Sequence, residues 1–160
     1  MPTSETIQSS GGDYTSPQAW YDAHAGDISL DPNAPYIGEM AAEEFQGPLL
    51  MGASTTDADH YFHLRAQVGA EFRGDFGASY PTVNHDATAE FCVLISDDYT
   101  RIEHIVAKQD PDSPVPGAGR SYGIHVAEAA SILLDTVGAY GMTVAAEGLV
   151  LLVWGIMAES

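Results

Sequence analysis

Two carboxylates at one spacing are the first candidates for chemistry in this chain. Asp97 and Glu128 are 31 residues apart, an offset that also relates two pairs of apolar residues, Val93 with Ile124 and Ile95 with Val126. Carboxylates stacked at equivalent positions could bind calcium through several oxygens, or act as a paired acid and base, as in glycoside hydrolysis. Stacking like charges without a cation costs free energy, which favours an ion. The third interpretation, solvated carboxylates on turns, is favoured because an acidic chain has many of them.

The histidines give a weaker signal for a metal site. His60 and His63 have a spacing of three, and residues three apart on a strand point to opposite faces, so they are not expected to converge on one ion. Arg101 and Lys108 are the only cations near the carboxylates that could serve as the base of a lyase. No nucleophile, zinc-protease or phosphate-loop motif is present. We therefore predict a non-enzymatic protein without catalytic residues or a required cofactor, with calcium at Asp97 and Glu128 as the alternative.

Charge and composition exclude several classes of partner. The 160 residues include 23 Asp or Glu and 5 Lys or Arg, a net charge of −18. Nucleic-acid binding depends on neutralising phosphates, so neither nucleic acids nor pectin-like polyanions are expected partners. No signal peptide is visible at the start of the chain. The longest apolar run, residues 148–157, is shorter than the roughly 20 residues that span a bilayer, so no membrane partner is expected. Cys92 is the single cysteine and is predicted to be buried and inert.

Short apolar runs between residues 91 and 157 predict the elements that position these groups. We expect two strands in each of three units: 91–95 with 100–106, 123–126 with 132–137, and 142–144 with 150–154. Matches at a period of 18 support this division: Ile124 with Met142, Val126 with Val144, Ile132 with Val150, and Leu134 with Leu152. The larger offset of 31 is attributed to a Pro- and Gly-rich insertion at 110–119. The pattern predicts a β-solenoid of about three coils.

The first ninety residues are predicted to start and cap this solenoid. Ser16 as N-cap, Pro17 at the first helical position and Gly26 as a stop predict a short helix. Trp20 and Tyr21 on that helix are the predicted N-terminal cap of the first coil. Strands are expected at 5–8, 36–40, 49–51 and 60–66, and an ordered aromatic loop at 69–81. The prediction is a single domain over 1–160, with the cap and entry strands at 1–90 and the coils at 91–160.

Three segments resemble a known family. Residues 6–20 are similar to the "GGDYTTLQAW" opening of right-handed parallel β-helix proteins of the pectate-lyase-like class. Residues 52–61 match their "TTDATHY" segment, and 98–103 resemble their "YVRIEGL" rung. The resemblance covers almost the whole chain in the family's order. It implies an all-β, short right-handed parallel β-helix with an N-terminal capping helix and irregular N-terminal strands, of the kind found in tailed-phage virion proteins and bacterial surface proteins.

The last coil suggests how such a protein would act. It is almost entirely apolar, and an apolar, unfinished solenoid end is expected to be covered by another chain. The predicted interface residues are Leu149, Val150, Leu151, Leu152, Val153, Trp154, Ile156 and Met157. The expected function is that of a phage virion protein, a capsid decoration (cement) or head or tail accessory protein. It would assemble in the host cytoplasm as a homotrimer and contact the major capsid protein or another virion protein.

Two other functions stay open from the sequence. The first is a carbohydrate-binding or carbohydrate-cleaving β-helix, whose groove would be lined by aromatic residues: Trp20, Tyr61, Phe72, Phe76 and Tyr80. The second is a cell-surface module released from a longer ancestor.

Overall fold

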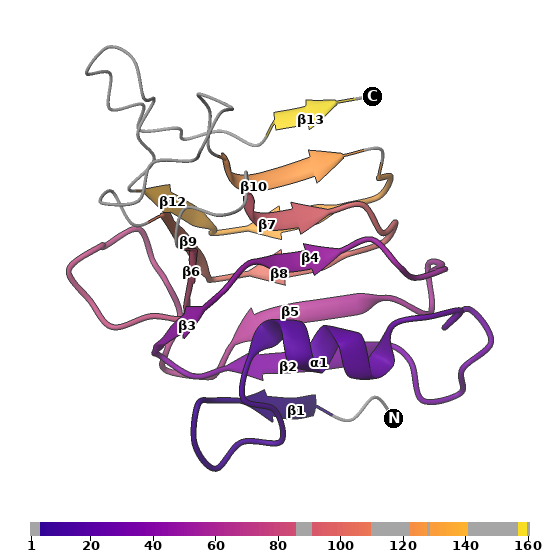
Figure 1. Ribbon diagram of the computed structural model, residues 1–160, viewed down its shortest axis with the longest axis horizontal. Coiled ribbons are helices and arrows are strands. Elements are labelled where there is room, and N and C mark those ends of the chain that lie inside the picture. The colour runs from indigo at the N-terminus through magenta and orange to yellow at the C-terminus, as the bar shows by residue number, and fades with distance from the viewer. Residues whose placement is uncertain (1–3, 86–90, 110–121, 128, 141–156, 160) are drawn as a thin grey trace.

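The computed structural model describes residues 4–85, 91–109, 122–127, 129–140 and 157–159 (Figure 1). Within these residues the chain forms a short helix and parallel strands that stack on one another. The elements are β1 (Ser4–Ile7), α1 (Pro17–His24), β2 (Tyr36–Met40), β3 (Glu44–Gln46), β4 (Leu49–Met51), β5 (Phe62–Ala66), β6 (Thr82–His85), β7 (Phe91–Ile95), β8 (Arg101–Glu103), β9 (Val106–Gln109), β10 (Tyr122–Ala127), β11 (Leu133–Asp135), β12 (Gly138–Tyr140) and β13 (Met157–Glu159).

The strands belong to three sheets, and all the strand pairs are parallel. The orders are β1-β2-β5-β8-β11, β4-β7-β10-β13 and β3-β6-β9-β12. From β2 onward the chain visits the three sheets in rotation, so consecutive strands lie in different sheets. Strands before residue 90 pair directly with strands after it, for example β5 with β8 and β6 with β9.

The predicted right-handed parallel β-helix of about three coils is wrong for this structure. The parallel strands form three separate sheets that are not closed, and each sheet keeps two edges. The strands before residue 90 are also not irregular, because β2 to β6 are members of these sheets. The correct description is a mostly β protein of three open parallel sheets with one helix among the described residues.

The register explains why the sequence period was misleading. Ile124 pairs with Val93 and Val126 with Ile95, an offset of 31, while Leu134 pairs with Ile102, an offset of 32. One repeat therefore contains three strands, one for each sheet. The predicted insertion at 110–119 lies outside the described residues. The matches at 18 all involve residues between 142 and 152, which lie outside the described residues. Strand pairs formed after residue 90 have offsets of 31 and 32, and none of the described strands pairs at an offset of 18.

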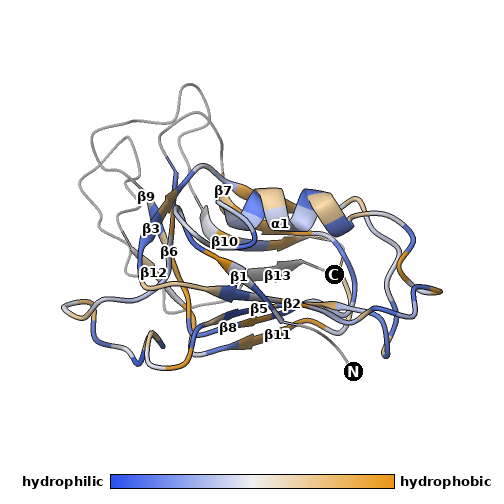
Figure 2. Cartoon of the chain, turned by 90° about the horizontal axis from the view of Figure 1, so that it is seen from below, coloured by the Kyte–Doolittle hydropathy of each residue, from blue (hydrophilic) through white to orange (hydrophobic). Residues whose placement is uncertain are grey.

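Apolar side chains from all three sheets form one core. Leu64 and Ile102 come from the five-stranded sheet, Val83 from the β6 sheet, and Val93 and Ile95 from the β7 sheet; all are at most 1% exposed. Figure 2 shows the sheets on different sides of this interior. Successive side chains of a strand point to opposite faces, so each strand directs alternate residues to the core and to its outer face. Cys92 is buried, and burial raises the pKa of its thiol to about 12, which makes it inert.

Helix α1 covers one edge of the β4 sheet. Ser16 is its N-cap, with the hydroxyl accepting from the Ala19 N–H at 3.1 Å, as its sequence predicted. Gln18 reaches the edge strand β4, where its side-chain oxygen accepts from the Leu50 N–H at 2.6 Å and its amide donates to the Leu50 carbonyl at 3.3 Å. In Figures 1 and 2 the helix accordingly lies in line with this sheet. No helix among the described residues is long and apolar enough to cross a membrane.

The aromatic loop after β5 packs against a sheet through two of its three aromatic side chains. Phe72 and Tyr80 are buried against Val106 on the outer side of the β6-β9-β12 sheet. A Cβ on Gly138 of β12 would lie 2.8 Å from the Phe72 ring, so the loop packs directly on the backbone there. The loop thus covers one outer face of the stack and leaves the outer face of the five-stranded sheet open for a site.

Candidate functional site

A groove opens where strands β5, β8 and β11 begin. It has a volume of 390 Å³, and its walls come from the turns that lead into three neighbouring strands of the five-stranded sheet. The lining residues are Ala58, Tyr61, Tyr99, Arg101 and residues 131–133. Arg101 pairs in register with Leu133 on one side and with His63 on the other, so its side chain is presented on the outer face. The groove is open to solvent on one side.

Arg101 differs from the other cations whose positions the structure describes. Arg65 lies 2.6 Å from Glu39, Arg73 lies 3.4 Å from Glu71, and Lys108 lies 2.7 Å from Glu44. Within the described residues, the side chain of Arg101 makes no ion pair and no hydrogen bond. Its guanidinium instead stacks over the Tyr61 ring at 4.0 Å from the ring centroid. In a chain of net charge −18, an unpaired guanidinium in a groove is available for a ligand.

His63 lies beside Arg101 and is buried on the outer face of β5. Its Nε2 is 3.2 Å from a carboxylate oxygen of Glu103, but without hydrogen-bond geometry. Burial lowers the pKa of His63, and this outweighs the opposing effect of Glu103, with Arg65 and Arg101 lowering it further. The imidazole is therefore neutral at pH 7 and adds no charge next to the groove.

The lowered pKa of His63 predicts a specific loss of stability in acid. The unfolded chain takes up this proton below about pH 6.5, while the folded chain resists it. The stabilisation is complete above about pH 6.5 and is lost as the pH falls toward the folded-state pKa. Urea unfolding between pH 7 and 5 should show a shallower decline for His63→Gln than for the wild type. His60→Gln is the control, because His60 pairs with Asp57 in a half-exposed turn. Equal declines for H63Q and the wild type would contradict the assignment.

Asp97, the first of the predicted calcium candidates, is held by protein donors. It is 2% exposed. One carboxylate oxygen accepts from the Tyr21 hydroxyl at 2.6 Å and the other from the Ser54 N–H at 3.0 Å. Burial, and then the bond to Asp97, raises the pKa of Tyr21, so the phenol stays a donor. Both oxygens of Asp97 accept hydrogen bonds, so this carboxylate links the helix α1 to the turn after β4.

The other predicted site residues are placed only in part. Glu128 and the interface residues 149–156 lie outside the described residues, and only the backbone of Met157, in β13, is described. Within the described part of the chain, no group of three or more His, Cys, Asp or Glu side chains could hold a metal ion. His60 and His63 contact different carboxylates, those of Asp57 and Glu103.

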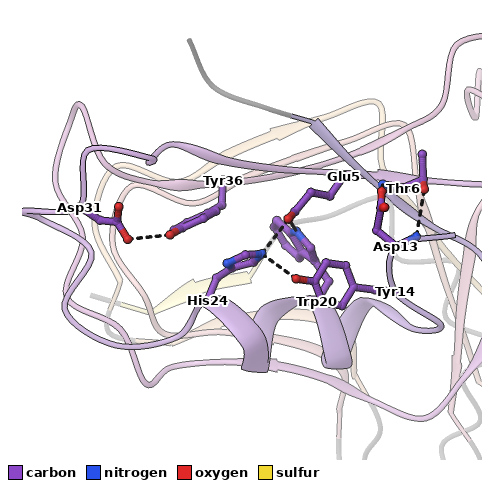
Figure 3. Close-up of polar contacts among 8 residues, drawn as sticks. All are labelled: Glu5, Thr6, Asp13, Tyr14, Trp20, His24, Asp31 and Tyr36. Atoms are coloured by element: carbon purple, nitrogen blue, oxygen red, sulfur yellow. Dashed lines mark hydrogen bonds and ion pairs between the residues drawn. The ribbon is translucent and has the colours of Figure 1, made fainter.

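Trp20 and Tyr21, the predicted N-terminal cap, are both buried. Trp20 belongs to a polar and aromatic cluster that we call the N-terminal clasp: Glu5, Tyr14, Trp20, His24, Asp31 and Tyr36 (Figure 3). Glu5 accepts from the Trp20 indole at 3.1 Å and lies 2.7 Å from Nε2 of His24. The His24 ring stacks on Tyr36 at 3.9 Å. The Tyr36 hydroxyl donates to Asp31 at 2.6 Å, which raises the pKa of Tyr36 to about 12. These groups bond to one another, so the clasp fastens β1 to α1.

Three comparisons with known proteins add no relative. No family model, curated protein or solved structure matches this chain. The candidate site therefore depends on its own geometry, and the family resemblance stays a prediction.

The groove differs from the one predicted from aromatic residues alone. Of the five predicted residues, Tyr61 lines the observed groove, whereas Trp20 and Phe72 are buried in separate places. Phe72, Phe76 and Tyr80 contact one another in the loop after β5. Tyr99 was not predicted as a site residue. The offset of 32 between β8 and β11 is the signal that could have found the groove, because it aligns the turns before those strands.

Proposed function

We propose that this chain is a non-enzymatic structural protein of a tailed-phage virion, a capsid decoration or head or tail accessory protein. It acts through contacts with copies of itself and with the major capsid protein or another virion protein. The sequence resemblance supports this proposal. The observation in the structure that carries it is a difference between the two ends of the strand stack.

At one end of the stack, two of the three edge strands, β4 and β1, are held by the protein's own chain. The helix α1 satisfies both backbone groups of Leu50 at the edge of β4 through the side chain of Gln18. On the neighbouring sheet, β1 is fastened to α1 through Glu5 and His24. Edge strands that are covered in this way do not pair with other chains.

The other end presents strand edges. β11 and β12 are the last strands of their sheets among the described residues. The N–H groups of Leu133 and Gly138 donate inward to the stack, to Thr100 and Ile105, each at 3.0 Å. Because successive residues of a strand direct their backbone groups to opposite neighbours, the N–H groups of Leu134 and Ala139 point away from β8 and β9, on the side where no described strand pairs with them. An edge of this kind can accept a strand from another chain.

Ala139→Pro tests this proposal at the open edge. Proline removes the N–H that faces outward and leaves the pairing of β12 with β9 intact. We expect the wild type to form a homo-oligomer and to co-sediment with phage particles, and the proline variant to lose both properties. Light scattering after size exclusion and particle co-sedimentation measure the two.

The matched control is Ala139→Ser, which keeps the N–H and should assemble as the wild type does. Far-UV circular dichroism checks that both variants are folded. A monomeric wild type without affinity for particles would contradict the proposal. So would a folded A139P variant that assembles normally.

Carbohydrate binding or cleavage stays the alternative prediction. This prediction was based on five aromatic residues, which the structure does not bring into one groove. Of the five, Tyr61 lines the groove at the start of β5, β8 and β11. Binding or turnover on a panel of polysaccharides tests this alternative.

A further inference from the structure

The groove at the start of β5, β8 and β11 combines three features that belong together in a binding site. It has a volume of 390 Å³, two tyrosines in its walls, and the side chain of Arg101. This arginine has no ion-pair partner among the residues that the structure describes, whereas Arg65, Arg73 and Lys108 each pair with a glutamate. The proposed contacts at the edges of β11 and β12 do not involve the side chains of Arg101 or the two tyrosines.

The stacking of Arg101 on Tyr61 fixes how the guanidinium can be used. The ring covers one face of the guanidinium at 4.0 Å, which leaves the N–H groups along its edge for a ligand. A planar fork of N–H donors matches a carboxylate, which it binds through two parallel hydrogen bonds. Holding the fork against an aromatic ring reduces the conformational entropy lost on binding.

The walls and the overall charge limit the rest of the ligand. Tyr99, Ile132 and Leu133 offer apolar and aromatic surface beside Arg101, and Leu133 is 45% exposed. An apolar or ring-shaped body would bury this surface. The net charge of −18 repels polyanions, whereas a single negative charge is offset by the one guanidinium. His63, next to Arg101, is neutral because burial lowers its pKa.

From this geometry we infer that the groove binds a small ligand with a single carboxylate on an apolar or sugar-ring body. Arg101 binds the carboxylate, Tyr61 orients Arg101, and Tyr99 with Leu133 contacts the body of the ligand. The groove shares Leu133 with the edge strand β11, but Arg101 and both tyrosines lie outside β11 and β12, so the inference does not depend on the virion role.

Titrations of the full-length chain with four probes test this inference. D-Glucuronate carries a carboxylate on a sugar ring, benzoate carries one on an apolar ring, glucose is neutral, and oligogalacturonate is a polyanion. Isothermal calorimetry or NMR chemical-shift changes give the dissociation constants. We expect glucuronate or benzoate, or both, to bind at least tenfold more tightly than glucose and than oligogalacturonate per carboxylate. Which of the two binds more tightly identifies the body of the ligand as a sugar or an apolar ring.

Variants locate the binding. Arg101→Gln should weaken binding of the preferred carboxylate at least tenfold. Arg73→Gln removes the same charge from an exposed loop, where Arg73 pairs with Glu71, and should bind as the wild type does. Tyr61→Ala should weaken binding less than R101Q, because the guanidinium remains. The inference is overturned if neither carboxylate binds, if glucose binds as tightly, or if R101Q and R73Q change the affinity equally.

Discussion

Asp97→Ala is expected to lower the free energy of unfolding by about 2–3 kcal/mol, because two donors lose their buried carboxylate acceptor. Asp97 is 2% exposed, and its removal would take the acceptor from the Ser54 N–H and leave the Tyr21 hydroxyl with only the longer contact to the Ser54 hydroxyl, at 3.2 Å. These bonds tie α1 and the turn after β4 to the turn after β7, so the loss should appear as lower global stability. Urea unfolding followed by far-UV circular dichroism measures it.

Asp59→Ala is the matched control for Asp97→Ala. It removes the same charge from an exposed turn and should change stability by less than about 0.5 kcal/mol.

The effect of calcium on the melting temperature provides a separate test of Asp97. Since both oxygens of Asp97 are engaged by protein donors, millimolar calcium should not raise the melting temperature in an Asp97-dependent way. A calcium-induced rise that D97A abolishes would contradict this expectation and would identify Asp97 as a calcium ligand.

Trp20→Ala is expected to cost about 3–5 kcal/mol, the range for removing a fully buried large aromatic side chain. Trp20 is 0% exposed and packs edge-on against Phe62 at 5.8 Å. A Cβ on Gly38 would come within 2.9 Å of its ring, which shows how closely β2 approaches the helix. The substitution would also leave Glu5 without the indole donor. Urea unfolding by far-UV circular dichroism gives the loss.

Two further variants separate the contributions of Trp20. Trp20→Phe keeps most of the ring volume but lacks the N–H for Glu5, so its stability should fall between those of the wild type and W20A. Leu30→Ala removes an apolar side chain that is 85% exposed and should be nearly neutral. A loss below about 1 kcal/mol for W20A would contradict the view that Trp20 anchors α1 on the first strands.

Local signals in the sequence were sufficient for several elements. The helix α1 begins at Pro17 because Ser16 caps it, and both residues are adjacent in the chain. The alternating pattern at Tyr36–Met40 is a strand as predicted. All four short strands of the third sheet, β3, β6, β9 and β12, were missed. A strand of three or four residues has too little pattern to distinguish it from a turn. The buried position of Cys92 also followed from its apolar neighbours.

Strand pairing could not be read in the same way. Neighbours in the sheets are 24 to 44 residues apart, as the pairs of Thr82 with Val106 and Leu49 with Val93 show. Parallel pairing depends on which strands, distant in the chain, bury their apolar faces together. Short aliphatic strands have such similar sequences that the sequence does not distinguish the correct partner. For this reason the period of 18 predicted closed two-strand coils, whereas the structure has open sheets visited in rotation.

The candidate site shows the same division. By itself the sequence determined the composition on which the site depends: an acidic chain with five cations, and tyrosines near two strands. Only the tertiary structure decided that Arg65 pairs with Glu39 while Arg101 stacks on Tyr61, and that Asp97 is buried beneath Tyr21. The physical reason is that charge and burial depend on neighbours across the sheets. Pairing between strands that are distant in the chain sets those neighbours. This pairing places Arg101 in a groove without an acidic partner among the described residues.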